Sequence, residues 1–159
     1  MDDWAGFAGA VTGASAALLG LLVVALSINL RQIVQSAGLP RRALIALLML
    51  VVPLVAGVLL LVPQSSPAYG IEILVLGVLL GAWIVFLAGP TARPVGQTFG
   101  AWLAGTAAPV GIVVVAILVT GVLLTVGHPA GLYGLPVVVL AGFIGSLIGT
   151  WVLLVEILR

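Results

Sequence analysis

The stretch ALIALLMLVVPLVAGVLLLV, from Ala43 to Val62, decides the fold class of this chain. It carries no charge over about the 20 residues that an α-helix needs to cross the hydrocarbon core of a bilayer. The pair Arg41-Arg42 precedes it directly, as is typical of an anchor at a membrane interface. Four further apolar runs follow the same pattern and occupy residues 5–30, 71–88, 101–126 and 135–158. The sequence therefore predicts an all-α polytopic bundle with five transmembrane helices.

The composition excludes other architectures. Hydrophobic residues make up 64% of the chain and charged residues 6%, whereas soluble domains contain about 25% charged residues. The apolar runs are continuous, which excludes a transmembrane barrel because barrel strands alternate apolar and polar residues. Apolar periodicity extends the first helix to about residue 36, before a stop signal at Gly38 and Pro40. We predict a single transmembrane domain over residues 1–159, with helices at about 5–36, 43–62, 71–89, 101–126 and 135–158.

The basic residues predict how the chain is oriented. When the chain is threaded through five spans, every basic residue falls on one side of the membrane: Arg31, Arg41, Arg42, Arg93 and Arg159. By the positive-inside rule this side is cytoplasmic, so we expect the N-terminus outside and the C-terminus inside. The use of Arg without Lys, among abundant Ala, Gly, Leu and Val, is typical of a GC-rich bacterial genome. The expected location is therefore the bacterial inner membrane, as a multi-pass protein.

Aromatic residues cluster near the expected membrane boundaries. Trp4, Tyr69 and Tyr133 fall at the outer boundary, and Phe99 and Trp102 fall at the inner one. Amphipathic rings are enriched at both interfaces of membrane proteins. We interpret these five residues as interfacial anchors.

Two predicted helices carry a stripe of small residues. At about 100° per residue, the four glycines of the first helix share a face about 60° wide, which continues toward Ser27 and Arg31. The last helix carries a similar face. The members are Gly6, Gly9, Gly13, Gly20 and Ser27 in the first helix, and Gly142, Gly145, Ser146 and Gly149 in the last. Small residues allow close helix packing, but such a face can also line a narrow pore or a lipid-binding groove. Both interpretations stay open.

A possible ion pair follows from these stripes. The first and last helices both run from outside to inside, so packing of their stripes would bring Arg31 and Glu156 to one depth at the cytoplasmic boundary. Arg159, three residues after Glu156, is the competing partner.

Few residues of the chain can carry chemistry. The absence of cysteine excludes disulfides, thiolate catalysis, Fe–S clusters and Cys-type zinc sites. The single histidine, His128, cannot form a histidine metal site within one chain, and it lies in an outer loop away from the membrane serines. No ionisable residue falls near the bilayer midplane, where ion-coupled transporters keep one. We therefore expect no catalytic, metal or cofactor-binding residues, no enzymatic activity and, without a basic face, no nucleic-acid partner.

Two stretches resemble known membrane proteins. ASAALLGLLVVALSINLR (Ala14–Arg31) and GLPRRAL (Gly38–Leu44) resemble a family of small bacterial inner-membrane proteins, some of whose members are labelled modulators of a membrane-anchored AAA protease. The resemblance covers the first two helices and implies a protein–protein regulator, with no catalytic residues to transfer. Fragments 15–20 and 148–158 are similar to two helices of store-operated calcium channels, in which the first helix lines a homo-oligomeric pore. This chain lacks the acidic filter residue of those channels and has five helices instead of four.

Three functions are therefore expected as alternatives. The first is a homo-oligomeric channel or pore with the first helix near its axis. The second is a regulatory or scaffold subunit that docks on a larger membrane complex, such as a membrane protease. The third is a lipid-binding membrane protein. The expected partners are membrane lipids together with further copies of the chain or a larger complex, and the oligomeric state distinguishes these functions.

Overall fold

The computed structural model describes residues 2–36, 38–89 and 98–157, with side chains described for 3–36, 38–89 and 98–155. Within these ranges the regular structure is helical. Five stretches are long and apolar enough to cross a membrane: Ala5–Ile28, Leu39–Leu61, Ser66–Ala88, Phe99–Thr125 and Pro129–Val155. The prediction of an all-helical bundle with five candidate spans is confirmed.

The elements follow one another in a simple order. The long helices are α1 (Ala5–Ile28), α3 (Leu39–Leu61), α4 (Ser66–Ala88), α6 (Ala108–Thr125) and α7 (Gly134–Ile157). Shorter elements begin or join them: η1 (Asp2–Trp4), α2 (Leu30–Gln35), α5 (Phe99–Trp102), η3 (Leu103–Ala107) and η4 (Pro129–Tyr133). The segment η3 is a π-helix and connects α5 to α6 without a break.

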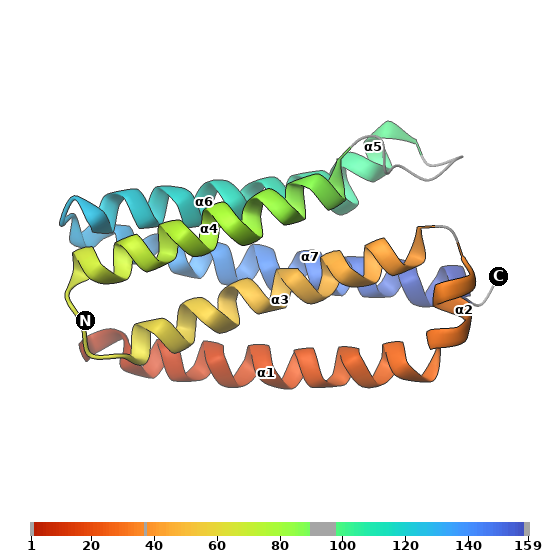
Figure 1. The fold of residues 1–159 in the computed structure, drawn as a ribbon, viewed down its shortest axis with the longest axis horizontal. Helices are drawn as coiled ribbons and strands as arrows, with labels where there is room; N and C mark the ends of the chain where they lie inside the picture. Colours follow the sequence, from red (N-terminus) through yellow and green to blue (C-terminus); the bar gives the residue numbers. More distant parts are fainter. Residues whose placement is uncertain (1, 37, 90–97, 158–159) are drawn as a thin grey trace.

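The long helices lie side by side along one common axis, and successive long helices run in opposite directions (Figure 1). α1 packs chiefly on α3 and forms one edge of the bundle, whereas α4 and α6 pack on each other at the opposite edge. α7 packs on both α3 and α6 and thereby joins the two pairs. The main core lies among α3, α4, α6 and α7 and includes the fully buried side chains Met49, Ile73, Ile117 and Val138.

Two helices begin earlier than the apolar runs indicated. α4 begins at Ser66 instead of about residue 71, because Ser65 caps it by accepting a hydrogen bond at Oγ from the Ala68 N–H at 3.4 Å. α3 begins at Leu39 instead of about residue 43. Gly38 takes a left-handed conformation with φ of 97° just before it, and Pro40 occupies the first turn, where a missing N–H costs nothing. The arginine pair thus belongs to the first turn of α3.

The sequence predicts a first helix that continues to about residue 36, but the observed helix is shorter. It ends at Ile28, and Asn29 breaks the helix before the short α2. The Asn29 side-chain amide donates to the carbonyl of Ala25 at 3.0 Å, a local bond that competes with helix continuation. α2 then lies close to α3 and α7, because Ile33 packs with Leu39 and Leu153. Burial of Ile33 therefore turns this segment across the end of the bundle.

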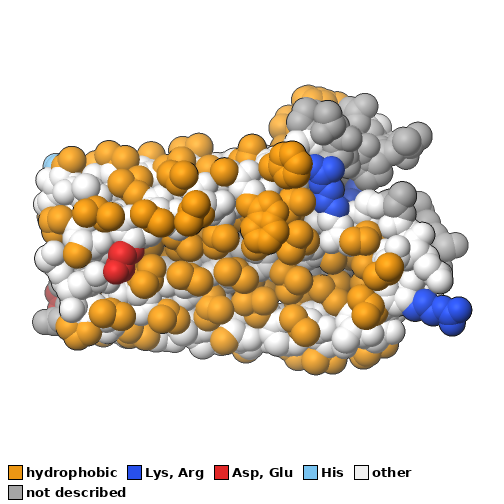
Figure 2. Space-filling view, viewed as in Figure 1, with side chains coloured by type: hydrophobic (Ala, Val, Ile, Leu, Met, Phe, Trp, Pro, Cys, Tyr) orange, Lys and Arg blue, Asp and Glu red, His pale blue; other side chains and the backbone are white. Residues whose placement is uncertain are grey.

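Charges separate to the two ends of the bundle. Figure 2 shows arginine side chains at one end, acidic side chains toward the other, and apolar side chains over the surface between them. At the basic end lie Arg31, Arg41 and Arg42, and at the acidic end lie Asp3 and Glu72. The remaining two arginines of the orientation argument, at positions 93 and 159, lie outside the described residues.

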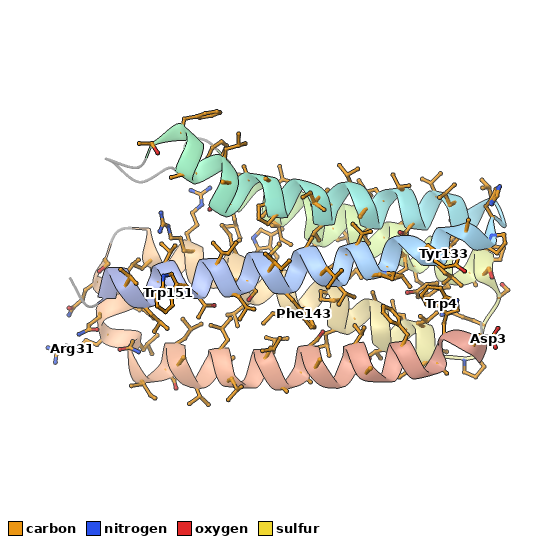
Figure 3. The ribbon with its side chains drawn as sticks, turned by 180° about the vertical axis from the view of Figure 1, so that it is seen from behind. Asp3, Trp4, Arg31, Tyr133, Phe143 and Trp151 are labelled. Atoms are coloured by element: carbon orange, nitrogen blue, oxygen red, sulfur yellow. The ribbon has the colours of Figure 1, made fainter. Side chains whose placement is uncertain are left out.

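The predicted aromatic anchors divide into two kinds. Trp4 packs edge to face on Phe7 and on Tyr133, with ring centroids 5.4 Å apart in both pairs, so these rings join the start of α1 to η4 (Figure 3). Tyr69 differs, because its side chain is fully buried and its hydroxyl donates to the Ala56 carbonyl at 3.0 Å. The interpretation of Tyr69 as an interfacial anchor is therefore wrong: this side chain ties α4 to α3 inside the bundle.

Candidate functional site

The glycine stripe of α7 lies inside the bundle. Gly142 and Gly145 are buried and Gly149 is half-buried, and all three face other helices of the same chain. A Cβ atom built at Gly145 would lie 2.6 Å from Met49 Cε of α3 and 2.8 Å from Pro109 Cβ of α6. The α7 stripe thus packs in the seam where α7 meets both α3 and α6.

The contact of this stripe with the backbone of α3 lies one turn before a proline. Pro53 has no N–H, so the carbonyl of Met49, four residues earlier, lacks its usual helical donor. That carbonyl oxygen lies 2.6 Å from the position a Cβ would take at Gly142. The oxygen is therefore close to the Gly142 backbone, where weak Cα–H···O contacts stabilise helix pairs. Only glycine fits this approach without moving the two backbones apart.

The glycine stripe of α1 faces away from the bundle. Gly6, Gly9, Gly13 and Gly20 are exposed, and a Cβ built at any of them has nothing within 4 Å. The opposite face is buried and consists of Ala8, Val11, Ser15 and Leu22. At about 100° per residue, the centres of the two faces lie about 160° apart around the helix. The α1 stripe is therefore an outer surface of the chain.

The expected contact between the two stripes does not form within this chain. α1 attaches to α3 through its other face, where Ala8 and Thr12 lie against Gly57. The α7 stripe is already occupied by Met49 and Pro109. Of the remaining stripe residues, Ser27 is exposed, with its hydroxyl bonded to the Val24 carbonyl at 2.8 Å. Ser146 is buried in α7 and lines an apolar groove between α7 and α1, with a volume of about 260 Å³.

The structure describes only the Arg31 side chain of the predicted Arg31–Glu156 pair. Arg31 belongs to α2, beyond the break at Asn29, and its exposed side chain points away from the end of the bundle (Figure 3). The side chain of Glu156 lies outside the described residues. The end of α7 does meet α2, because Leu153 packs on Ile33. The ion pair stays a prediction.

A groove opens between α3, α6 and α7 toward the basic end. It has a volume of about 250 Å³, and most of its surface is apolar. Its walls include Arg42, Met49, Gly105, Pro109 and Gly149. An arginine, three glycines (Gly105, Gly145 and Gly149) and an irregular helix segment thus meet at this groove.

The irregular segment follows from the sequence around Pro109. The π-helical η3 widens the helix over Leu103–Ala107, and the Ala108 N–H donates to the Leu103 carbonyl, five residues back. Pro109 then supplies no N–H, so one carbonyl of the preceding turn lacks the donor that a regular helix would give it. Single π-turns inside helices are frequent at functional sites. The groove lies against this segment, since Gly105, Thr106 and Pro109 all line it.

Arg41 ties two helices together at the basic end. Its Nε donates to the Leu87 carbonyl at 2.6 Å and its Nη2 to the Phe86 carbonyl at 2.7 Å. The guanidinium also lies 5.9 Å from the centre of the Phe86 ring. The last carbonyls of a helix have no intrahelical donor and carry the negative end of its dipole, so this cation satisfies them. Arg41 is thus a structural residue of the α3–α4 contact.

The two buried serines and the histidine belong to different elements of the fold. Ser15 and Ser146 are buried in α1 and α7, whereas His128 is exposed between α6 and η4. Among residues 3–36, 38–89 and 98–155, the fully buried side chains that carry a polar group are Ser15, Tyr69, Thr120 and Ser146. None of these side chains is an acid or a base of the kind that general acid–base catalysis uses most often.

Sequence reasoning missed the groove and found only parts of its wall. Gly145 and Gly149 belonged to the predicted α7 stripe. Arg42 was interpreted only as an anchor, and Gly105 was not singled out. Pro109 within an apolar helix is the signal that could have located the irregular segment, because it supplies no N–H to the preceding turn.

The described residues thus form a helical bundle whose five long apolar helices could span a membrane, with an outward small-residue face on α1 and a groove at the basic end. Comparison with family models, curated proteins and solved structures finds no match to the chain. The resemblance to bacterial inner-membrane proteins therefore stays a prediction.

Proposed function

We propose that this chain is a non-enzymatic integral protein of the bacterial inner membrane that assembles with copies of itself through α1 and forms a homo-oligomeric channel or pore. The observation that carries the proposal is the outward direction of the α1 glycine stripe. In lipid, helices associate by close packing of small residues, because the tails are as apolar as the side chains. A stripe that faces away from its own bundle is free to pack against α1 of another copy.

The burial of the helices supports the same proposal. Of the most apolar 18-residue window, 17% is buried in α1, against 56% in α3. α1 is therefore the least buried of the five candidate spans. Within one chain, the fully buried side-chain polar groups of the described residues are the hydroxyls of Ser15, Tyr69, Thr120 and Ser146, which lie on four different helices. A conducting path would therefore have to form between copies, with α1 near the axis.

The assembly is tested by replacing glycines of the α1 stripe with larger residues. The double variant Gly9→Leu/Gly13→Leu adds side chains where the chain itself has nothing within 4 Å, so the fold of one copy is preserved. Overpacking a helix interface costs about 1–3 kcal/mol per site, so the dissociation constant of the oligomer should rise at least about tenfold. Native mass spectrometry from nanodiscs should show oligomers for the parent and monomers for the variant. In liposomes, only the parent should release trapped K⁺ and Cl⁻.

Gly111→Leu is the matched control, because Gly111 of α6 also has open space around its Cβ position. Its oligomers should equal those of the parent. A parent chain that is monomeric in nanodiscs would contradict the channel and favour the second function, a regulatory or scaffold subunit that uses the same α1 face to dock on a larger complex such as a membrane protease. Oligomers that survive the double variant would place the interface on another helix.

The orientation is a separate proposal, with the N-terminus outside and the C-terminus in the cytoplasm. It is supported by Arg31, Arg41 and Arg42 at the end of the bundle where α7 finishes. Fusion of alkaline phosphatase or green fluorescent protein after residue 159 checks it. We expect fluorescence and no phosphatase activity, and the reverse result would invert the topology.

A further inference from the structure

The groove at the basic end has features that the proposed assembly through α1 does not use. It is formed by α3, η3, α6 and α7, whereas the outward stripe belongs to α1 on the edge of the bundle. Its walls are apolar except at Arg42 and Thr106.

Missing side-chain volume keeps the groove open. A Cβ at Gly105 would lie 3.9 Å from Ile148 Cγ2, and a Cβ at Gly149 would lie 3.6 Å from Ala46 Cβ. Both values are ordinary van der Waals contacts, so an added methyl group fits at either wall. The helices have therefore not closed on these two glycines as they have on Gly142 and Gly145, where a Cβ would collide with α3. The space that remains is about 250 Å³.

The arginine at the groove lies at the depth of the lipid headgroups. Arg42 is in the first turn of α3, directly after Arg41, whose guanidinium binds the last carbonyls of α4. The ends of two spans therefore coincide here, as they do at the interface of a bilayer. A guanidinium has five N–H donors in a planar fork, so it can bind a phosphate in addition to a partner within the protein.

We propose that this groove binds one anionic phospholipid of the inner leaflet. In this arrangement an acyl chain lies between Gly105 of the π-helical η3 and Gly149 of α7, and Arg42 binds the phosphate. Charge complementarity selects this occupant: an apolar helix of a second copy would bring no anion to the arginine, whereas a phospholipid places its phosphate just above its acyl chains. Arginine binds phosphate through two parallel hydrogen bonds, which are stronger than bonds between neutral groups.

The proposal is tested by native mass spectrometry of the delipidated chain in detergent, titrated with phosphatidylglycerol or phosphatidylcholine. We expect one phosphatidylglycerol per chain, bound about tenfold more tightly than phosphatidylcholine. Both lipids carry a phosphate, but the quaternary ammonium of choline repels the Arg42 guanidinium, and a tenfold difference requires only about 1.4 kcal/mol of such repulsion. Arg42→Gln should remove this preference. Gly149→Leu and Gly105→Leu add side chains to opposite walls of the groove. Each variant should weaken the binding of phosphatidylglycerol at least about tenfold, because the added side chain fills the acyl site. Glycerol 3-phosphate, which has no acyl chain, should not compete.

Two controls match these variants. Arg31→Gln removes the same charge from the same end of the bundle but from the exposed α2, and Gly111→Leu fills a wholly apolar groove on the outer face of α6 and α7. Both should bind phosphatidylglycerol as the parent does. Gly149→Ala reports on folding, because its added methyl group makes an ordinary contact with Ala46.

Equal binding of both lipids, unaffected by Arg42→Gln and by either leucine variant, would mean annular lipid only and would overturn the proposal. Competition by glycerol 3-phosphate would also overturn it, because the ligand would then be a soluble phosphate. None of these outcomes depends on the oligomeric state, so the lipid site and the assembly through α1 fail or stand separately.

Discussion

Replacement of Gly142 by alanine is expected to lower the free energy of unfolding by about 2–3 kcal/mol, within the range of overpacked interiors. The added Cβ would lie 2.6 Å from the Met49 carbonyl oxygen. This oxygen belongs to the backbone of α3 and cannot rotate aside as a side chain can, so α7 and α3 must separate. Contacts of the whole seam, including Gly145 with Met49, would loosen with it. Titration with sodium dodecyl sulfate in mixed micelles, followed by tryptophan fluorescence, measures the change.

Gly111→Ala is the appropriate comparison, because it makes the same substitution inside a long helix but meets nothing within 4 Å. Alanine has the better helix propensity by up to about 1 kcal/mol, so this variant should equal or exceed the stability of the parent. If Gly142→Ala matched Gly111→Ala, the close approach of Gly142 to Met49 would be wrong. The pair thus separates packing from propensity at two glycines of one protein.

The second large effect is expected at Arg41. Arg41→Gln removes two charge-assisted hydrogen bonds to the Leu87 and Phe86 carbonyls and leaves the end of α4 without donors. Bonds to charged groups are worth about 1.5–3 kcal/mol each when buried, and Arg41 is only half-buried, so we expect a loss of about 2 kcal/mol. Hydrogen exchange should also become faster in the last turn of α4.

Arg41→Lys distinguishes the fork from the charge. An ammonium group can satisfy one carbonyl but lacks the planar pair of donors, so the loss should be intermediate. Arg31→Gln removes an exposed arginine at the same end and should change the stability by no more than about 0.5 kcal/mol. Equal effects of the substitutions at Arg41 and Arg31 would show that net charge, and not the bonds to α4, stabilises this end.

The sequence could predict the number and approximate extent of the spans because the bilayer imposes a length and a polarity that each run must meet. The ends of the helices depended on local chemistry. Ser65 extends α4 by capping it, and Gly38 with Pro40 begins a helix instead of only ending one. The break at Asn29 depended on burial of Ile33 against Leu153, a contact between residues 120 positions apart that no local pattern contains.

The direction of each stripe could not be predicted for a physical reason. In a soluble protein the apolar face of a helix turns inward, but in lipid both faces of α1 are apolar and neither is driven from the solvent. Periodicity correctly grouped Gly9 with Gly13 and Gly145 with Gly149, yet it could not say that the first group would face outward and the second inward. That difference arises from three-dimensional fit, such as Thr12 against Gly57.

The position of α7 has a consequence for the order in which the bundle is built during synthesis. α1 and α3 emerge first and already hold their mutual contact, and α4 and α6 then form the second pair. Chains fold progressively from the N-terminus as they are made. Until α7 arrives, the Met49 and Pro109 surfaces that it covers face lipid, and the two pairs share only the smaller contact between α3 and α4. The C-terminal helix is thus the closing element of assembly, and a nascent chain that stalls before Gly134 holds two helix pairs without their common partner.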